Sequence, residues 1–117
     1  MADNTQLIYH ITWMDDWMMA ERQGWYDAPS LASDGFIHCS YKDQVIDTAG
    51  RYYAGNTCLV LLEIDPAKLQ SRLKAEKSTD DALFPHVYGR INLDAVLRVA
   101  GFEPQPDGSF IFPMELL

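Results

Sequence analysis

The N-terminal part of the chain alternates hydrophobic and polar positions first with the period of a strand and then with that of a helix. Residues 7–12 predict a strand. Its alternation places Leu7, Tyr9 and Ile11 on one face and Ile8, His10 and Thr12 on the other. Residues 14–23 predict a helix, because Trp13, Trp17 and Ala20 recur at helical spacing. Gly24 is suited to end that helix with a left-handed residue.

The middle of the chain predicts a second strand and helix. Residues 25–33 predict a loop or short helical turn containing Pro29, and Asp34-Gly35 predicts a tight turn. Residues 36–40 predict a short strand with Phe36, His38 and Ser40 on one face. Ser40 is the expected cap of a helix over 42–54, which Gly55 ends. The buried stripe of this helix is expected at Val45, Ala49 and Tyr52.

The remaining pattern predicts several strands joined by short turns. Residues 57–64 form the most apolar strand, which we expect near the centre of a sheet. Further strands are predicted at 72–77, 84–88 and 95–103, with a mobile polar loop at 78–82. Asp107-Gly108 predicts a hairpin that pairs the last of these strands with residues 109–112.

Late strands without long intervening helices predict an α+β fold with a curved, mostly antiparallel sheet and two main helices. No repeat or linker divides the 117 residues, so we predict a single domain, 1–117, with its core at about 7–113.

Composition narrows the possible partners. The chain has 17 acidic and 9 basic residues and a net charge of −8. This balance argues against extensive nucleic-acid binding and against an anionic membrane surface, which both require clustered Lys and Arg. A small anionic ligand remains compatible, because one or two Arg can hold a phosphate.

Location and redox state follow from weaker signals. The N-terminus lacks a secretory pattern, and the longest apolar run, Cys58–Leu62, is too short to span a bilayer, so we expect a cytoplasmic protein. Cys39 and Cys58 match no CxxC pattern. Both lie among apolar residues and are expected to be buried, reduced thiols.

Two histidines share a pattern that suggests a ligand pocket. His10 and Thr12 alternate on one strand face, and His38 and Ser40 do so on another. Such groups are costly to bury unless they bond to one another or to a ligand. The structural alternative is that each imidazole bonds a carbonyl or a carboxylate.

Other site types find less support. Three histidines could bind catalytic zinc, but their spacing matches no metal motif, and we predict no metal. The GxSxG elbow of hydrolases, the P-loop and GxGxxG are all absent.

The segment Phe84–Ile91 combines aromatic, imidazole and guanidinium groups. As a nucleotide site it would use Tyr88 for stacking and Arg90 for a phosphate; as a strand end it would use His86 to cap a carbonyl.

Two charged residues have competing interpretations. Glu76 is either a general base or ribose ligand, or a solvated side chain between lysines; Arg51 is either a phosphate contact or part of a surface salt bridge. The three tryptophans are expected in the core.

Several motifs occur in an order that resembles a small bacterial family described only as a domain of unknown function. They are Ile8-Tyr9-His10-Ile11, Pro29-Ser30-Leu31, Asp34 to Ser40, Leu59 to Asp65 and Phe84 to Gly89. The resemblance covers about residues 7–113. That family is similar to the ADP-ribosyltransferase fold and its RNA 2′-phosphotransferase group, which implies a split, curved sheet with NAD bound in its cleft.

The resemblance also implies residue roles. His10 would bond the nicotinamide ribose, Thr12 and Ser40 would add hydrogen bonds, and His38 would bond ribose or phosphate. Tyr88 or Tyr9 would stack on a ring, and the reaction would be transfer or hydrolysis at the anomeric carbon. Many members of that fold carry a catalytic Glu, for which Glu76 is the only candidate here. Alternatives are a non-catalytic module that binds a small ligand or protein, and an RNA phosphotransferase, which the sparse basic residues disfavour.

Overall fold

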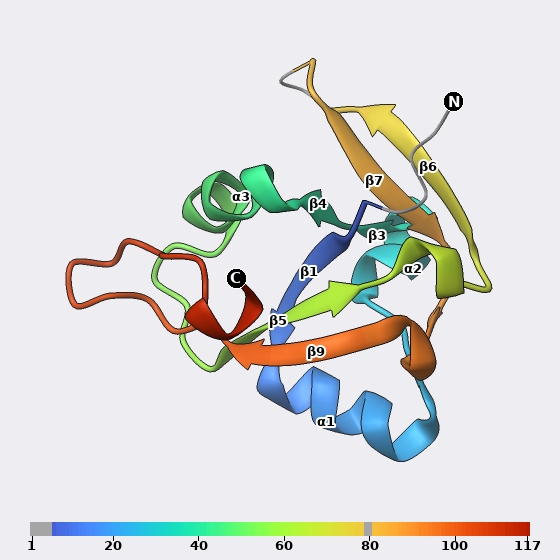
Figure 1. Ribbon diagram of the computed structural model, residues 1–117, viewed down its shortest axis with the longest axis horizontal. Helices are drawn as coiled ribbons and strands as arrows, with labels where there is room; N and C mark the ends of the chain where they lie inside the picture. Colours follow the sequence, from blue (N-terminus) through green and yellow to red (C-terminus); the bar gives the residue numbers. More distant parts are fainter. Residues whose placement is uncertain (1–5, 79–80) are drawn as a thin grey trace.

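The computed structural model describes residues 6–78 and 81–117, and within them the chain forms antiparallel sheets with three α-helices (Figure 1). The strands are β1 (Ile8–Trp13), β2 (Trp25–Tyr26), β3 (Ile37–His38), β4 (Ser40–Tyr41), β5 (Leu59–Ile64), β6 (Arg72–Lys77), β7 (Leu83–Tyr88), β8 (Ile91–Asn92) and β9 (Val96–Gly101). The α-helices are α1 (Met14–Gln23), α2 (Pro29–Asp34) and α3 (Val45–Tyr52), and 3-10 turns cover Lys42–Gln44, Pro66–Lys68, Leu93–Ala95 and Met114–Leu116. The predicted α+β class is confirmed.

The main sheet has the strand order β4-β1-β5-β9. β5 pairs with β1 on one side and β9 on the other, and all six of its residues are buried. The expectation that the most apolar strand lies in the interior of a sheet is confirmed, because a run without alternation can bury both faces.

A second sheet diverges from the first beside Cys39. β3 and β4 are consecutive, separated by Cys39 alone, but β4 pairs with β1 whereas β3 pairs with β7 in the order β3-β7-β6. One extended segment therefore serves two sheets. Figure 1 shows α3 and the β6–β7 hairpin on opposite sides of the place where the sheets part. The short strands β2 and β8 form a separate pair.

Two apolar clusters cover the faces of the main sheet. The first contains Ile8, Val60, Leu62 and Ile64, with Trp17 and Ala20 of α1 and with Ile37 and Val87 of the second sheet. The second contains Tyr9, Ile11, Leu59 and Leu61, with Val45 and Ala49 of α3 and with Phe102, Phe110 and Leu116. The alternation predicted for residues 7–12 assigns β1 residues correctly to these two faces.

Helix α1 occupies the predicted residues, Met14–Gln23. Its C-cap Gly24 has φ 98° and donates its N–H to the Ala20 carbonyl. That conformation favours glycine because it carries no Cβ. Of the tryptophans, Trp17 is buried, whereas Trp13 is exposed and Trp25 is half-buried, so the prediction of three core tryptophans is wrong for Trp13.

The second predicted helix differs in its start and in its buried face. Residues 42–44 form a 3-10 turn before α3 begins, and the Gln44 side chain, not Ser40, caps the turn by accepting the Tyr41 N–H. Ser40 Oγ lies 3.2 Å from Thr48 Oγ1 instead. Tyr52 is 68% exposed, because the helix ends there and Tyr53 turns inward instead, donating to the Ile11 carbonyl.

The predicted C-terminal hairpin is only partly formed. Gly108 adopts φ 87° in a turn, but residues 109–112 form no strand. Pro104 and Pro106 cannot donate to a ladder, and Phe110 packs instead against Phe102, with ring centroids 5.1 Å apart.

Three further expectations can be compared with the fold. Cys39 is buried as predicted, but Cys58 is exposed, since it lies at φ 60° just before β5 begins at Leu59. The predicted mobile loop at 78–82 lies partly outside the described residues. In the part of the chain that the structure describes, no helix has the length and apolarity needed to cross a membrane.

Candidate functional site

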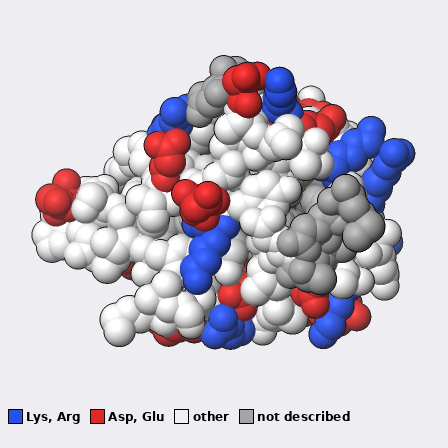
Figure 2. Space-filling model, turned by 45° about the horizontal axis from the view of Figure 1, so that its top comes forward, with Lys and Arg blue, Asp and Glu red and all other residues white. Residues whose placement is uncertain are grey.

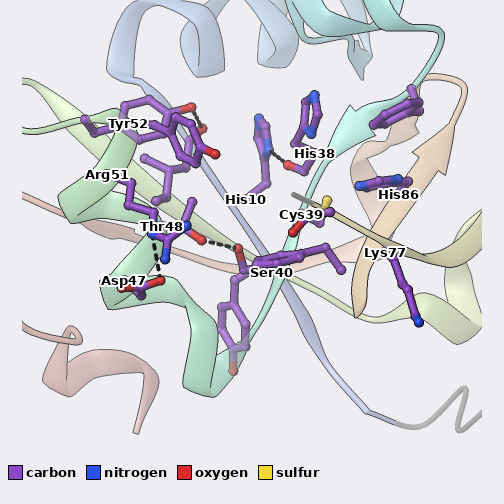
Figure 3. A pocket seen from close by; sticks show the side chains of 16 residues that line it. His10, His38, Cys39, Ser40, Asp47, Thr48, Arg51, Tyr52, Lys77 and His86 are labelled. Atoms are coloured by element: carbon purple, nitrogen blue, oxygen red, sulfur yellow. Dashed lines mark hydrogen bonds and ion pairs between the residues drawn. The ribbon is translucent and has the colours of Figure 1, made fainter. Parts of the chain in front are cut away.

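A cleft of about 740 Å³ opens where the two sheets part (Figure 3). Its lining comes from β1, from the β3–β4 segment, from α3 and from the β6–β7 hairpin. These residues are Tyr9, His10, Ile11, Phe36, His38, Cys39, Ser40, Asp47, Thr48, Arg51, Tyr52, Tyr53, Lys77, Ser78, Phe84 and His86. The volume is typical of small-molecule sites.

One wall of the cleft is a face of α3. Asp47, Thr48, Arg51 and Tyr52 line it, and in Figure 3 they lie across from His38 and His86. Arg51 Nε is 3.2 Å from Asp47 Oδ2, an i, i+4 pair between partly exposed side chains. This wall is held in place because Val45 and Ala49 fix the adjoining face of the helix in the core.

The other wall combines two histidines with an aromatic ring. His38 and His86 are directly paired across β3 and β7, with ring centroids 5.4 Å apart. Phe36 stacks on the His86 ring at 4.0 Å and meets the His38 ring edge at 4.7 Å. Phe36 and His86 are nearly parallel, with an interplanar angle of 18°, whereas the His38 ring stands at 64° to Phe36 and 77° to His86.

His10 lies at the base of the cleft and is held by the protein on both sides. Its Nδ1 is 2.6 Å from the His38 carbonyl oxygen, and its Nε2 is 2.7 Å from Tyr26 Oη. A carbonyl only accepts, so Nδ1 carries a proton and donates it. Burial lowers the pKa of His10 to about 4, which leaves the ring neutral at pH 7.

The tautomer of His10 fixes the rest of this network. Because its Nε2 has no proton, the single hydroxyl proton of Tyr26 is donated to it. Tyr26 Oη also lies 2.9 Å from Thr12 Oγ1, and with its own proton used, it accepts from that hydroxyl. Backbone pairing of β1 with β4 ends at Tyr9 and Ser40, so the His10 side chain bridges the two diverging strands.

His38 is the most exposed of the three imidazoles. Its side chain is 56% exposed, and Nε2 lies 2.9 Å from Asp34 Oδ2 at the end of α2. This hydrogen bond holds the pKa of the Asp34 carboxyl below its usual value. His38 is therefore oriented by a carboxylate outside the cleft.

His86 is oriented in the same way but is much less accessible. Its side chain is 9% exposed, and Nδ1 lies 2.9 Å from Glu76 Oε1 on the neighbouring strand β6. Tyr88 donates its hydroxyl to the same oxygen. The Tyr88 hydrogen bond and then the His86 bond lower the pKa of the Glu76 carboxyl. Glu76 is thus paired rather than merely solvated, and His86 binds a carboxylate rather than the expected carbonyl.

Tyr9 borders the cleft, but its hydroxyl belongs to a second network. It donates to Glu63 Oε2 at 3.1 Å, and Arg98 donates to the same buried carboxylate from Nε at 2.7 Å and Nη2 at 3.0 Å. Burial, followed by the Glu63 contact, raises the pKa of Tyr9 to about 12. Sequence reasoning missed Glu63, whose place within an apolar strand was the available signal.

Six of the ten residues predicted for the site line the cleft: Tyr9, His10, His38, Ser40, Arg51 and His86. Thr12, Glu76, Tyr88 and Arg90 do not. Thr12 is buried beside Tyr26, whereas Glu76 and Tyr88 lie behind His86. Arg90 lies 4.2 Å from the centroid of the Trp25 ring, beside a separate hollow.

Several lining residues were not predicted, among them Phe36, Thr48, Tyr52 and Lys77. The spacing of Asp47, Thr48, Arg51 and Tyr52 was the signal for the α3 wall, because positions i, i+1, i+4 and i+5 share one side of a helix. Lys77 gave no comparable signal, since its approach to the cleft depends on how the sheets diverge.

Thiol and metal chemistry have little basis in this cleft. Cys39 lines it but is buried, and burial raises the pKa of its thiol, so the thiol stays protonated near neutral pH. Among residues 6–78 and 81–117, no group of three or more His, Cys, Asp or Glu side chains is arranged to hold a metal ion.

Fold and site together define a small α+β protein with a cleft between diverging antiparallel sheets. The chain belongs to the family described as Protein of unknown function (DUF952), whose model matches residues 11–99. This confirms the family resemblance inferred from the sequence motifs.

Solved structures of a similar protein show the same fold. The crystal structure of CC0527 from Caulobacter crescentus has a TM-score of 0.83 and 35% identity, covering 90% of this chain and 93% of that one. Its solution NMR structure gives a TM-score of 0.78 and 35% identity, covering 89% and 90%. A search of curated proteins found no match.

Proposed function

We propose that this protein binds a nucleotide of the NAD type in the cleft between α3 and the β3–β7 wall. The observation that carries this proposal is the pairing of an aromatic and imidazole surface, formed by Phe36, His38 and His86, with a cationic side chain across the cleft, Arg51. A base or nicotinamide ring can pack against this cluster of rings by stacking or edge-to-face contact, and a phosphate suits the guanidinium.

The local charge of the cleft supports an anionic ligand despite the acidic chain. Among the described residues, two cations, Arg51 and Lys77, line it against one carboxylate, Asp47. Figure 2 shows acidic and basic side chains interspersed over one face of the molecule rather than gathered in a single patch. This distribution fits a local phosphate contact better than an extended nucleic-acid track.

The ion pairs that Arg51 and Lys77 form with other described residues do not prevent such a contact. Arg51 and Lys77 pair with Asp47 and Asp81, each at 3.2 Å and between largely exposed side chains. Surface pairs of this kind contribute about 0–1 kcal/mol, so a phosphate can replace the carboxylate as the preferred partner.

The resemblance to ADP-ribosyltransferases supports the same ligand class, since that fold binds NAD in the cleft of a split sheet. A second candidate is a non-catalytic module for a small ligand. It is favoured by the state of His10, whose ring nitrogens are both engaged by Tyr26 and the His38 carbonyl. In this proposal His10 stabilises the cleft, and the bond to the nicotinamide ribose expected from the resemblance is not assigned to it.

The proposal is tested by calorimetric titration of NAD into the protein and two arginine variants. Arg51→Gln should weaken binding by about 10- to 100-fold, as expected for the loss of a charge-assisted hydrogen bond. Arg90→Gln is the matched control, because Arg90 lies over Trp25 outside the cleft and should leave the affinity unchanged.

Other results of this titration would show that NAD does not bind in the cleft. Equal weakening by both variants, or an effect of Arg90→Gln alone, would overturn the cleft assignment. Absence of NAD binding by the parent protein would refute the ligand class; binding of a 2′-phosphorylated RNA at low salt in its place would favour the phosphotransferase alternative.

A further inference from the structure

The three histidines differ in which ring nitrogens the protein uses. Both nitrogens of His10 have protein partners, and His38 uses Nε2 for Asp34 at an exposed position. His86 alone combines a nearly buried ring on the cleft wall with a carboxylate at Nδ1. No hydrogen bond from its Nε2 to another described residue is found, so that nitrogen can meet a ligand. His38 Nδ1 also has no hydrogen bond to a described residue, but its ring is 56% exposed and its carboxylate partner, Asp34, lies outside the cleft.

We propose that His86 is the general base of this cleft and that Glu76 is its positioning residue. Glu76 accepts the Nδ1 proton of His86 at 2.9 Å, which fixes the tautomer whose Nε2 carries a lone pair. Tyr88 donates to the same carboxylate oxygen, so Glu76 is itself held in place. Phe36, stacked at 4.0 Å, fixes the plane of the imidazole and shields one face from water.

Several charged or ionisable groups lie close to His86. An imidazolium formed on His86 would face the Glu76 carboxylate, whose Oε1 lies 2.9 Å from Nδ1. Among the described residues, the other such groups are Tyr88, which donates to Glu76, His38, whose ring centroid is 5.4 Å away, and Lys74, which is paired with His86 across β6 and β7.

This inference rests on the proposed function and makes the cleft an enzyme site. In the reaction, the bond between ribose C1′ and the nicotinamide nitrogen breaks, and nicotinamide leaves with the bonding electron pair. A new bond forms between C1′ and the oxygen of water or of an acceptor hydroxyl. The hydroxyl proton passes to His86 Nε2 and is later released to solvent, so charge and atoms balance.

The first test needs no ligand. Long-range ¹H–¹⁵N NMR spectra should show His86 as the Nδ1–H tautomer in the neutral ring, as for His10. Glu76→Gln, which retains an acceptor oxygen, should preserve this tautomer, and Glu76→Leu should lose it. An Nε2–H tautomer in the parent protein would overturn the proposal, because that nitrogen could then not accept a proton.

The second test measures NAD binding and nicotinamide release in the same variants. His86→Gln should reduce release at least about 100-fold while changing the NAD dissociation constant only a few-fold. Glu76→Gln should reduce release about 10- to 100-fold and move the acid limb of the pH profile. Glu21→Gln, an exposed carboxylate variant on α1, is the control for charge.

The outcomes separate this inference from the proposed function. NAD binding without release by the parent, or normal release by His86→Gln, overturns the base assignment and leaves the binding site standing. A loss of NAD affinity in His86→Gln that accounts for the whole loss of release would leave the residue a ligand contact only and also overturn the assignment. Absence of NAD binding by the parent refutes the proposed function and with it this reaction, whatever tautomer NMR reports.

Discussion

The three histidines of this protein differ in role because their ring nitrogens have different hydrogen-bond partners. Both ring nitrogens of His10 bond to buried protein groups. His38 bonds to the Asp34 carboxylate at an exposed position, and the nearly buried His86 bonds to the Glu76 carboxylate, which does not line the cleft. The repeated strand pattern in the sequence makes His10 and His38 equivalent, and the structure separates them. The cause is burial, which lowers the pKa of His10 to about 4 and makes protonation of that ring costly.

The stability of the fold should therefore depend on pH through His10. Its pKa is about 4 when folded and 6.5 ordinarily, so the unfolded chain binds a proton at higher pH than the folded chain. The His10 contribution is complete above about pH 7 and is lost as the pH falls from about 6.5 through 4, by about 3 kcal/mol in all. Urea unfolding at pH 7 and pH 4 should show this loss.

The matched comparison is His10→Gln, which cannot titrate. It should be less stable than the parent at pH 7, because the buried network with Tyr26 is disturbed, but its stability should fall less between pH 7 and pH 4. Equal losses in the two proteins would show that carboxylates, and not His10, set the acid sensitivity.

At the scale of elements, local signals predicted the position of most strands and helices. Helix α1 matches its predicted ends, since its apolar spacing and Gly24 are both local features. The start of α3 and the C-terminal segment were predicted less well. The helix cap predicted at Ser40 is provided instead by the Gln44 side chain. The strand predicted at residues 109–112 is replaced by a segment whose Phe110 packs on Phe102. Such competition between partners is decided by tertiary contacts.

Two glycines should respond oppositely to the same substitution. Gly89 follows β7 with φ 150°, and a Cβ there would lie 2.4 Å from Ser71 Oγ, which donates to the Arg90 carbonyl. Gly89→Ala should destabilise the protein by about 1–3 kcal/mol, because it displaces that hydroxyl and strains the backbone. Gly50 lies in α3 with open space around its Cα, and Gly50→Ala should stabilise by about 0.5–1 kcal/mol.

Urea or thermal unfolding of both variants measures the difference. A neutral Gly89→Ala would mean that Ser71 rotates away at little cost, and a destabilising Gly50→Ala would mean that the exposed face of α3 is more constrained than its surroundings indicate.

At the scale of the whole molecule, the candidate site is a consequence of topology. Sequence motifs identified β1 and the β3–β4 segment as carriers of the site, because each combines His with a hydroxyl residue. They could not show that Cys39 separates two sheets, nor that α3 and β6 would then face each other across the cleft. Glu76 was recognised as a candidate, but its partner His86 depends on the β6–β7 register, which no local pattern encodes.

Because the cleft walls come from separate parts of the chain, a ligand that spans them should couple those parts. Saturating NAD should slow amide hydrogen exchange in α3 and in the β6–β7 hairpin together, since both contribute lining residues. At 100 times its dissociation constant it should raise the free energy of unfolding by about 2.7 kcal/mol. Arg51→Gln should reduce both effects at the same NAD concentration. Slower hydrogen exchange confined to one wall, or centred on Trp25 and Arg90, would show that the ligand does not span the cleft. The assignment of the cleft as the NAD site would then be wrong.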